Sequence, residues 1–252
     1  MAELYYSDEL VKLYLGDWKD AVGLVNDIGA VVTDPPYGVS HYSGGKVMPN
    51  AVAYRPIVGD DDTDAVKDFF AWLPYETNAV VFGANYFPEL LPHRGRWLCW
   101  DKRLSAKADR MFGSPFELAW QNSVLRSTKM FRCMHGGVVN ANGRGKDRLH
   151  PTEKPIPMLI DVIETLTNGL VFDPFAGSGT TLSAAKALGR PSVGVEIDEG
   201  YCAAAAATKL KVQRMKLVWS SFCAVPWRRL ILCGVLRRLG ATMSVIYMLQ
   251  MM

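Results

Sequence analysis

A short apolar run, a glycine-rich turn and a helix follow one another between residues 170 and 189, and this succession constrains the fold most strongly. The run 170–172 is typical of a buried strand. Gly177 and Gly179 lie in the turn, where they let the backbone approach a ligand closely. The helix predicted after the turn stops at Gly189, a favoured residue just past a helix end. We therefore expect an α/β fold with a ligand where this strand ends.

A second apolar run, Ser192–Val195, leads into Glu196, which lies 19 positions after Gly177. An acidic residue at about this distance accepts hydrogen bonds from ribose hydroxyls in nucleotide-binding folds. Leu182 stands where a dinucleotide site carries its third glycine, and no Lys follows the glycines as in a phosphate-binding P-loop. The segment predicts a site for a nucleoside without a pyrophosphate, a description that S-adenosylmethionine fits. A dinucleotide-binding oxidoreductase is the alternative interpretation.

The tetrapeptide Asp34-Pro35-Pro36-Tyr37 follows the apolar run Ala30–Thr33 and predicts a site for an amino group on an aromatic base. Such a nitrogen is a poor nucleophile because its lone pair is delocalised into the ring. The Asp34 carboxylate and the carbonyl at Pro35, held by two prolines that fix φ, can accept its two N–H bonds. Tyr37 can stack on the face of the base. A purely structural turn is the alternative.

The other apolar runs extend this pattern to a doubly wound, mostly parallel sheet of seven strands, with ligands at the carboxyl ends of the strands. The expected strands are Leu13–Leu15, Ala30–Thr33, Ala79–Phe82, Trp97–Trp100, Leu118–Gln121, Leu170–Phe172 and Ser192–Val195. A helix is expected from Pro157 to about Thr167, with prolines at its start and Asn168-Gly169 as its stop. The glycine turn and the tetrapeptide both follow strands, so both would face one crevice.

With His150–Pro155 (His-Pro-Thr-Glu-Lys-Pro) added, the chain resembles the β-class amino-methyltransferases of DNA, which methylate N6 of adenine or N4 of cytosine. The tetrapeptide comes first and the glycine-rich element last, a circular permutation of the usual methyltransferase order. Phe82–Tyr86 and Trp100–Lys102 resemble the compact forms carried by bacteriophages. The resemblance covers about residues 4–208. It implies a Rossmann-like sheet that uses S-adenosylmethionine.

The resemblance also implies roles for single residues. Asp34, Pro35, Pro36 and Tyr37 would hold the target amine. The residues implied to bind S-adenosylmethionine are Asp17, Thr152, Lys154, Asp173, Phe175, Gly177, Gly179, Thr180 and Glu196. Asp17 would contact the adenine and Glu196 the ribose. Thr152 and Lys154 would lie by the cofactor carboxylate, and Asp173 near its amino end. Asp17 could instead cap the helix that follows, and Lys154 could be a solvated charge.

The implied reaction is direct methyl transfer to the exocyclic amine of a base flipped out of the duplex. An Asp at position 34 favours N6 of adenine, whereas a Ser there is more typical of N4-cytosine enzymes; N4-cytosine methylation is the alternative. The absence of a Pro-Cys dipeptide argues against methylation at C5 of cytosine. The five cysteines and four histidines form no metal-binding pattern, so no metal is expected.

Positive charge is concentrated in residues 93–148, which hold twelve Lys and Arg against four Asp and Glu, although the chain carries a net charge of only +3. Such a surface suits phosphates, with a solvated face as the alternative. The candidate DNA contacts are Lys102, Arg103, Lys107, Arg110, Arg132, Arg144, Lys146 and Arg148. Residues 101–149 are the predicted target-recognition insertion of a methyltransferase domain spanning 1–216. Glycine-rich loops at 38–60 and 132–149 are expected to close over DNA.

Residues 217–252 form an apolar, basic tail that departs from the family, and its role stays open. Its longest uncharged run, Leu239–Met252, has 14 residues, too few to span a bilayer. The acidic start lacks an apolar stretch and no C-x-x-C pair occurs, so we expect a cytoplasmic protein of a bacterial or phage-infected cell. The expected partners are double-stranded DNA and, as in similar enzymes, a second copy of the chain. A methyltransferase acting on RNA or protein and a methyltransferase-fold DNA-binding protein without turnover are the rival functions.

Overall fold

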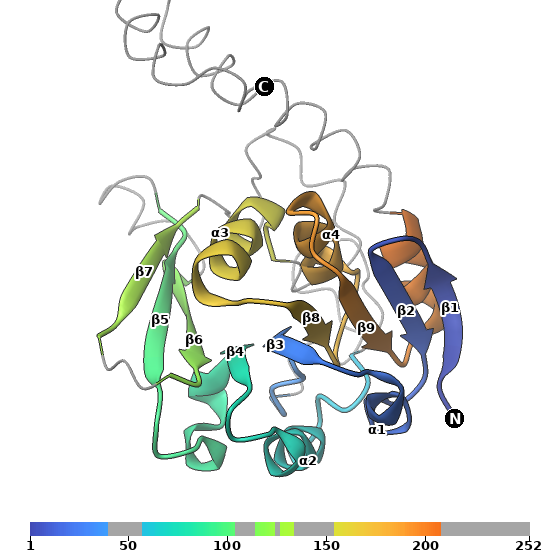
Figure 1. Ribbon diagram of the computed structural model, residues 1–252. Coiled ribbons are helices and arrows are strands. Elements are labelled where there is room, and N and C mark those ends of the chain that lie inside the picture. Colours follow the sequence, from blue (N-terminus) through green and yellow to red (C-terminus); the bar gives the residue numbers. More distant parts are fainter. Residues whose placement is uncertain (40–56, 104–113, 124–126, 134–153, 208–252) are drawn as a thin grey trace, which may run out of the picture. The chain divides into compact units, whose positions relative to one another are not determined.

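The computed structural model describes residues 1–39, 57–103, 114–123, 127–133 and 154–207 (Figure 1). The predicted tail 217–252 and most of the two predicted loops, 38–60 and 132–149, lie outside these residues.

Within the described residues, nine strands form one sheet in the order β1-β2-β9-β8-β3-β4-β6-β5-β7 (Figure 1). Their bounds are Glu3–Ser7 (β1), Val11–Leu15 (β2), Ile28–Thr33 (β3), Asn78–Phe82 (β4), Arg96–Asp101 (β5), Phe116–Gln121 (β6), Lys129–Arg132 (β7), Leu170–Asp173 (β8) and Ser192–Glu196 (β9). The five consecutive strands from β2 to β4 are parallel. Strand β1 is antiparallel to β2, and β6 is antiparallel to both β4 and β5. The predicted doubly wound, mostly parallel architecture is confirmed.

All seven expected strands are present, and the two further ones, β1 and β7, are the edges of the sheet. An edge strand is paired on one side only, so it does not need the continuous apolar run of a central parallel strand. Strand β1 reads Glu-Leu-Tyr-Tyr-Ser and is mostly exposed. Strand β7 reads Lys-Met-Phe-Arg, with only Phe131 buried. Neither edge strand therefore carries the apolar run that predicts a central strand.

Helices lie on both faces of the sheet, with α3 and α4 on one face and α1 and α2 on the other (Figure 1). The bounds are Trp18–Ala21 (α1), Asp64–Trp72 (α2), Ile156–Leu166 (α3) and Thr180–Ala187 (α4), with short 3₁₀ turns at Val22–Leu24, Ala84–Tyr86 and Pro88–Leu90. Helix α3 agrees with its expected bounds to within one residue, and Gly169 after it has a φ of 67°. Gly189 after α4 has a φ of 69°, as a helix-ending glycine should.

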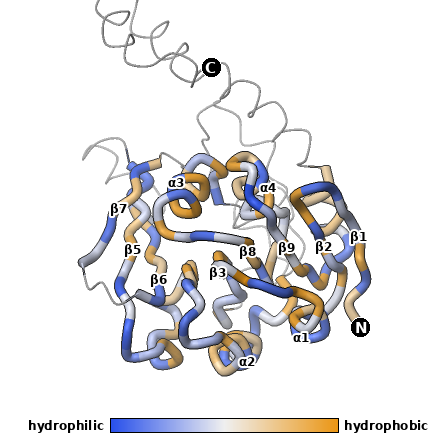
Figure 2. Tube along the Cα trace, viewed as in Figure 1, coloured by the Kyte–Doolittle hydropathy of each residue, from blue (hydrophilic) through white to orange (hydrophobic). Residues whose placement is uncertain are grey.

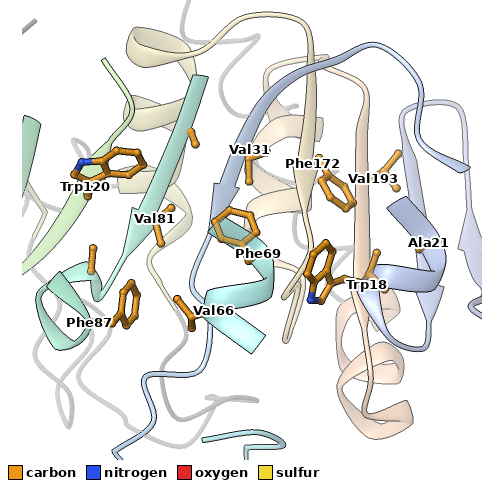
Figure 3. Packing of buried hydrophobic residues seen from close by; sticks show 13 residues of the cluster. Trp18, Ala21, Val31, Val66, Phe69, Val81, Phe87, Trp120, Phe172 and Val193 are labelled. Atoms are coloured by element: carbon orange, nitrogen blue, oxygen red, sulfur yellow. The ribbon is translucent and has the colours of Figure 1, made fainter. Parts of the chain in front are cut away.

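The core beneath α1 and α2 is built from aromatic rings packed on the parallel strands (Figure 3). Trp18 of α1 and Phe69 of α2 meet edge to face with ring centroids 6.3 Å apart. Val31 of β3 and Phe172 of β8 pack into the same cluster and are fully buried. Each such side chain stabilises the fold by roughly 1.5–3 kcal/mol. The hydrophobic residues of the strands and helices (Figure 2) therefore hold the ends of β3 and β8 next to each other.

Two kinds of feature are absent from the described ranges. None of the helices there has both the length and the apolar character needed to cross a bilayer. The same ranges hold no group of three or more His, Cys, Asp or Glu side chains placed to hold a metal ion.

Candidate active site

A cavity of about 560 Å³ lies where the carboxyl ends of the parallel strands meet. The tetrapeptide that follows β3 lines one part of it, and the glycine turn that follows β8 lines another. The predicted shared crevice is therefore confirmed. The predicted site residues that line it are Asp17, Asp34, Pro35, Pro36, Tyr37, Lys102, Lys154, Asp173, Phe175, Gly177, Thr180 and Glu196.

The glycine turn is held against the end of β9 by hydrogen bonds to Glu196. The Gly177 N–H donates to Glu196 Oε2 over 2.8 Å, and the Asp198 N–H donates to Oε1 over 2.8 Å. Gly179 has a φ of 76°, and a Cβ there would lie 2.7 Å from the Cβ of Ala205. The turn therefore takes a path that only glycine allows. Burial raises the pKa of Glu196, against the pull of these backbone N–H groups.

Asp173 is a buried carboxylate at the end of β8 that faces the cavity. Its Oδ1 accepts hydrogen bonds from the Thr33 hydroxyl and, over 3.1 Å, from the Phe175 N–H. Burial raises the pKa of Asp173 to about 6 despite these donors. A buried carboxyl that titrates this close to neutrality responds strongly to a cation brought beside it.

The cavity around the glycine turn fits a nucleoside cofactor with an ammonium group. Gly177 lines it without a side chain, Glu196 offers a carboxylate at the strand end, and Asp173 offers a buried carboxylate for a cation. The predicted residue Gly179 does not line the cavity and packs against Ala205 instead. The predicted residues Phe175 and Thr180 line the same region. Thr152 lies outside the described residues.

The carboxylate of Asp34 is bound on both oxygens. The Tyr37 hydroxyl donates to Oδ1 over 2.5 Å, and the Lys154 ammonium donates to Oδ2 over 2.5 Å. Burial raises the pKa of Asp34, although the contacts with Lys154 and Tyr37 act to lower it. Asp34 is therefore a buried hydrogen-bond acceptor whose strength depends on its partners.

The tetrapeptide is fixed from behind by Asp60, which the sequence reasoning did not identify. Asp60 Oδ1 accepts hydrogen bonds from the Tyr37 N–H over 2.9 Å and from the Gly38 N–H over 3.2 Å. Asp60 is 7% exposed. The run of three acidic residues at 60–62 before α2 was the available signal, because a loop acid that precedes a helix commonly binds backbone N–H groups.

The ring of Tyr37 stacks on Tyr86, with centroids 4.8 Å apart and 16° between the planes. Gly83, which has a φ of 66°, makes room for this ring, since a Cβ there would lie 2.0 Å from Tyr37 Cε1. Tyr86 lines the cavity and is 47% exposed. An aromatic platform is therefore present beside Asp34, formed by two rings rather than one.

Lys154 is 6% exposed, so the alternative of a solvated charge is wrong. Its ammonium group forms ion pairs with Asp34 and, over 3.5 Å, with Glu117 Oε2. Glu117 is paired in turn with Lys102. The resemblance implied that Lys154 would contact the cofactor carboxylate; in this structure it contacts these two protein carboxylates. Glu117 was missed, although an acid inside the apolar run 116–120 was a usable signal.

Asp17 fulfils the alternative that the sequence left open, since its Oδ1 accepts a hydrogen bond from the Lys19 N–H over 2.9 Å at the start of α1. It also lines the cavity. A capping carboxylate retains acceptor capacity on its other oxygen. The cap and a contact with a cofactor are therefore compatible.

Among the candidate DNA contacts, the described ones differ in their surroundings. Lys102 is paired with Glu117 inside the cavity, and Arg103 binds Asp101 at 3.0 Å. Arg132 lies 3.6 Å from Asp101, with 72% of its side chain exposed. The other candidates, Lys107, Arg110, Arg144, Lys146 and Arg148, fall outside the described residues.

Comparisons with known proteins find similarity to DNA methylases. A family profile described as DNA methylase, covering N6 and N4 methyltransferases, matches residues 101–207. The putative methylase YubD of Escherichia coli (strain K12) is 47% identical over 70 residues, which are 27% of this chain and 31% of that protein. The type II methyltransferase M.HinfI of Haemophilus influenzae is 42% identical over 67 residues, which are 23% of this chain and 19% of that protein. The chain thus spans about a third or less of these relatives.

The solved structure of PvuII DNA methyltransferase (cytosine-N4-specific) has a similar fold. The TM-score is 0.53 at 16% identity, with 85% of this chain and 94% of that chain covered. The sheet of this chain therefore has the fold of a solved DNA methyltransferase. Residues 101–207 thus resemble the N6/N4 DNA methylases, and this resemblance supports S-adenosylmethionine as the cofactor.

Proposed function

We propose that this protein is a DNA methyltransferase that methylates the exocyclic amine of a flipped base, with N6 of adenine as the target. One observation carries the proposal: Asp34, an acceptor for amine N–H groups, lies in the same cavity as the glycine turn and Glu196. The cofactor and the target base would then occupy neighbouring parts of one cavity. N4 of cytosine is the alternative target, and the aspartate at position 34 favours adenine.

The cofactor residues proposed here are Asp17, Thr152, Asp173, Phe175, Gly177, Gly179, Thr180 and Glu196. S-adenosylmethionine, when bound, supplies a methyl group on a positively charged sulfur. Glu196 would hold the ribose hydroxyls, and the Asp173 carboxylate would hold the ammonium group. Burial makes this second contact strong, because a charge pair out of water is weakly screened.

Asp34 and Tyr37 would hold the target base. The amine would take the place of the Tyr37 hydroxyl on Asp34 Oδ1, while Lys154 stays on Oδ2. The carbonyl at Pro35 would accept the second N–H. The base would stack beside the paired rings of Tyr37 and Tyr86. Catalysis would then come from alignment and from stabilisation of charge on the nitrogen, without a covalent enzyme intermediate.

Double-stranded DNA is the proposed substrate, and Arg132 and the basic residues of 101–149 are its proposed phosphate contacts. The target-recognition role of this segment, the cytoplasmic location and a homodimeric assembly are likewise proposals. The strands β6 and β7 within the segment belong to the central sheet, so recognition would depend on the residues that connect them.

The direct test is incubation with labelled S-adenosylmethionine and unmethylated duplex DNA, followed by digestion and identification of the modified nucleoside. N6-methyladenine is the expected product. Detection of N4-methylcytosine would support the same methyl-transfer reaction with cytosine as the target base. Label in RNA or protein alone, or no transfer despite a bound cofactor, would contradict the proposal and favour another acceptor or a binding protein without turnover.

A further inference from the structure

We propose that Glu117 is a positioning residue that shares Lys154 with Asp34. With Lys102 it completes a chain of alternating charges, Asp34–Lys154–Glu117–Lys102, which sets how strongly Asp34 attracts an amine N–H. The proposal rests on the function proposed above, because it assigns the strength of the amine acceptor to residues that need not touch the base. Two of the four, Glu117 and Lys102, come from the part of the sheet that lies beyond β4.

The four residues come from four separate parts of the fold. Asp34 follows β3, Lys154 lies just before α3, Glu117 is on β6 and Lys102 follows β5. Lys154 lies 2.5 Å from Asp34 Oδ2 and 3.5 Å from Glu117 Oε2, and Lys102 bonds to Glu117 Oε1. All four line the one cavity.

The pairing of β5 and β6 fixes the positions of Glu117 and Lys102 in the chain of charges. Trp100 is opposite Glu117 in the antiparallel register, and the Lys102 N–H donates to the Pro115 carbonyl over 3.1 Å. The ammonium of Lys102 also lies 4.9 Å from the centre of the Trp100 ring. Lys102 therefore has a defined place next to Glu117, and its 18% side-chain exposure is low for a lysine.

The pairing favours the charged forms of Lys154 and Glu117. Burial acts to lower the pKa of Lys154, but Asp34 and Glu117 outweigh it and raise this pKa. Burial acts to raise the pKa of Glu117, but Lys154 and Lys102 outweigh it and lower this pKa. Two carboxylates and two ammonium groups in alternation leave the group neutral in total, which reduces the cost of burying them.

Glu117 and Lys102 act on Asp34 with opposite signs. An ammonium bound to Asp34 alone would neutralise much of its charge and weaken it as an acceptor. Because Lys154 also pairs with Glu117, it neutralises less of the Asp34 charge. The Glu117 carboxylate carries a charge of the same sign as Asp34, so it also raises the pKa of Asp34. Lys102 neutralises part of the Glu117 charge, so it opposes the effect of Glu117 on the pKa of Asp34.

Other titratable groups also face Asp34. Tyr37 donates to it from the same loop, and Asp173 interacts with it from the end of β8. Tyr86, in the 3₁₀ turn after β4, and Asp60, in the loop before α2, contact Tyr37. Substitutions at Glu117 and Lys102 leave all of these in place. A difference in the pKa of Asp34 between the variants therefore reports on the chain of four charges.

The test compares Glu117→Gln and Lys102→Met in two measurements, the pH dependence of the methyl-transfer rate and the pKa of the Asp34 carboxyl by carbon NMR. Glu117→Gln should move the acid limb to lower pH by about 0.5 unit or more and reduce the maximal rate by about tenfold. Lys102→Met should move the acid limb to higher pH. Affinity for S-adenosylmethionine should stay within about twofold in both variants.

Asp64→Asn is the matched control, because it neutralises a carboxylate of an exposed pair with Lys67 on α2. It should leave the acid limb and the NMR titration unchanged. Shifts of the same sign in both test variants, or no shift in either, would overturn the proposal. Lys102→Met acts at the more weakly coupled end of the chain, so its sign remains testable even if Glu117→Gln folds poorly.

The NMR titration separates this proposal from the proposed function. Opposite shifts of the Asp34 pKa without methyl transfer to DNA would support the charge chain and contradict the methyltransferase assignment. If the protein transfers methyl groups to DNA but neither substitution shifts the pKa of Asp34, the methyltransferase assignment is supported and the charge chain is contradicted.

Discussion

Thr33, the last residue of β3, donates its hydroxyl to the carboxylate of Asp173, the last residue of β8, over 2.7 Å in the protein interior. The two residues are 140 positions apart in the sequence. Asp34 follows one strand and the glycine turn follows the other. The two halves of the proposed site are therefore joined by a buried hydrogen bond, which holds their separation constant.

Replacing Asp34 tests the proposed acceptor. Asp34→Asn keeps the shape but removes the charge that stabilises the amine, so the transfer rate should fall by about 10²–10³. Binding of S-adenosylmethionine should change by less than about twofold, because Asp34 is not among the proposed cofactor residues. Single-turnover kinetics and calorimetry measure the two quantities. A wild-type rate in this variant would show that Asp34 does not hold the amine.

Gly83→Ala tests the aromatic platform. The new Cβ would clash with the Tyr37 ring, so Tyr37 must move and the transfer rate should drop by at least tenfold. Gly189→Ala is the control, because its φ of 69° resembles the 66° of Gly83 and a Cβ there meets nothing within 4 Å. Both variants should lose about 1 kcal/mol of stability from backbone strain. Equal activities in the two variants would mean that the position of Tyr37 is unimportant.

Asp60→Ala tests the support behind the tetrapeptide. It leaves the N–H groups of Tyr37 and Gly38 without this acceptor, which should cost about 1–3 kcal/mol of unfolding free energy. The transfer rate should fall while cofactor affinity holds. Asp61→Ala, at an exposed position next to it, should change neither quantity. Chemical denaturation and kinetics on the same preparations check both expectations, and a similar loss in the two variants would contradict this role.

The raised pKa of Asp173 predicts a pH-dependent cofactor affinity. The protonated form is favoured below about pH 6, and an ammonium group beside Asp173 favours the charged form. Affinity should therefore be full above pH 6 and fall by about tenfold per pH unit below it. For folding the sign is opposite: an acid with a raised folded-state pKa lowers stability as pH rises from about 4 to about 6.

Asp173→Asn separates the effect of Asp173 from those of the neighbouring acids. Calorimetric titration with S-adenosylmethionine between pH 5 and pH 8 should show weaker binding with a shallower slope in this variant. Parallel curves for the variant and the wild type would place the ammonium group elsewhere.

The local parts of this protein follow from patterns in its amino-acid sequence. The central strands and helices α3 and α4 follow from apolar runs and stop signals, because a parallel strand is covered on both faces and a helix needs defined ends. The tetrapeptide after β3 and the glycine turn after β8 could be placed in one crevice, because the carboxyl ends of parallel strands meet at one edge of the sheet. Edge strands β1 and β7 were not indicated, since pairing on one side demands no apolar run.

Which side chains meet in the site depends on how the whole chain packs. Lys154, Glu117 and Asp34 come from three elements, and no local pattern specifies that one ammonium group is shared by two carboxylates. The support of Tyr37 by Asp60 and the space left by Gly83 likewise depend on how loops return to the sheet. Local propensity acts over a few residues, whereas burial and charge pairing act between whatever surfaces the packed sheet brings together.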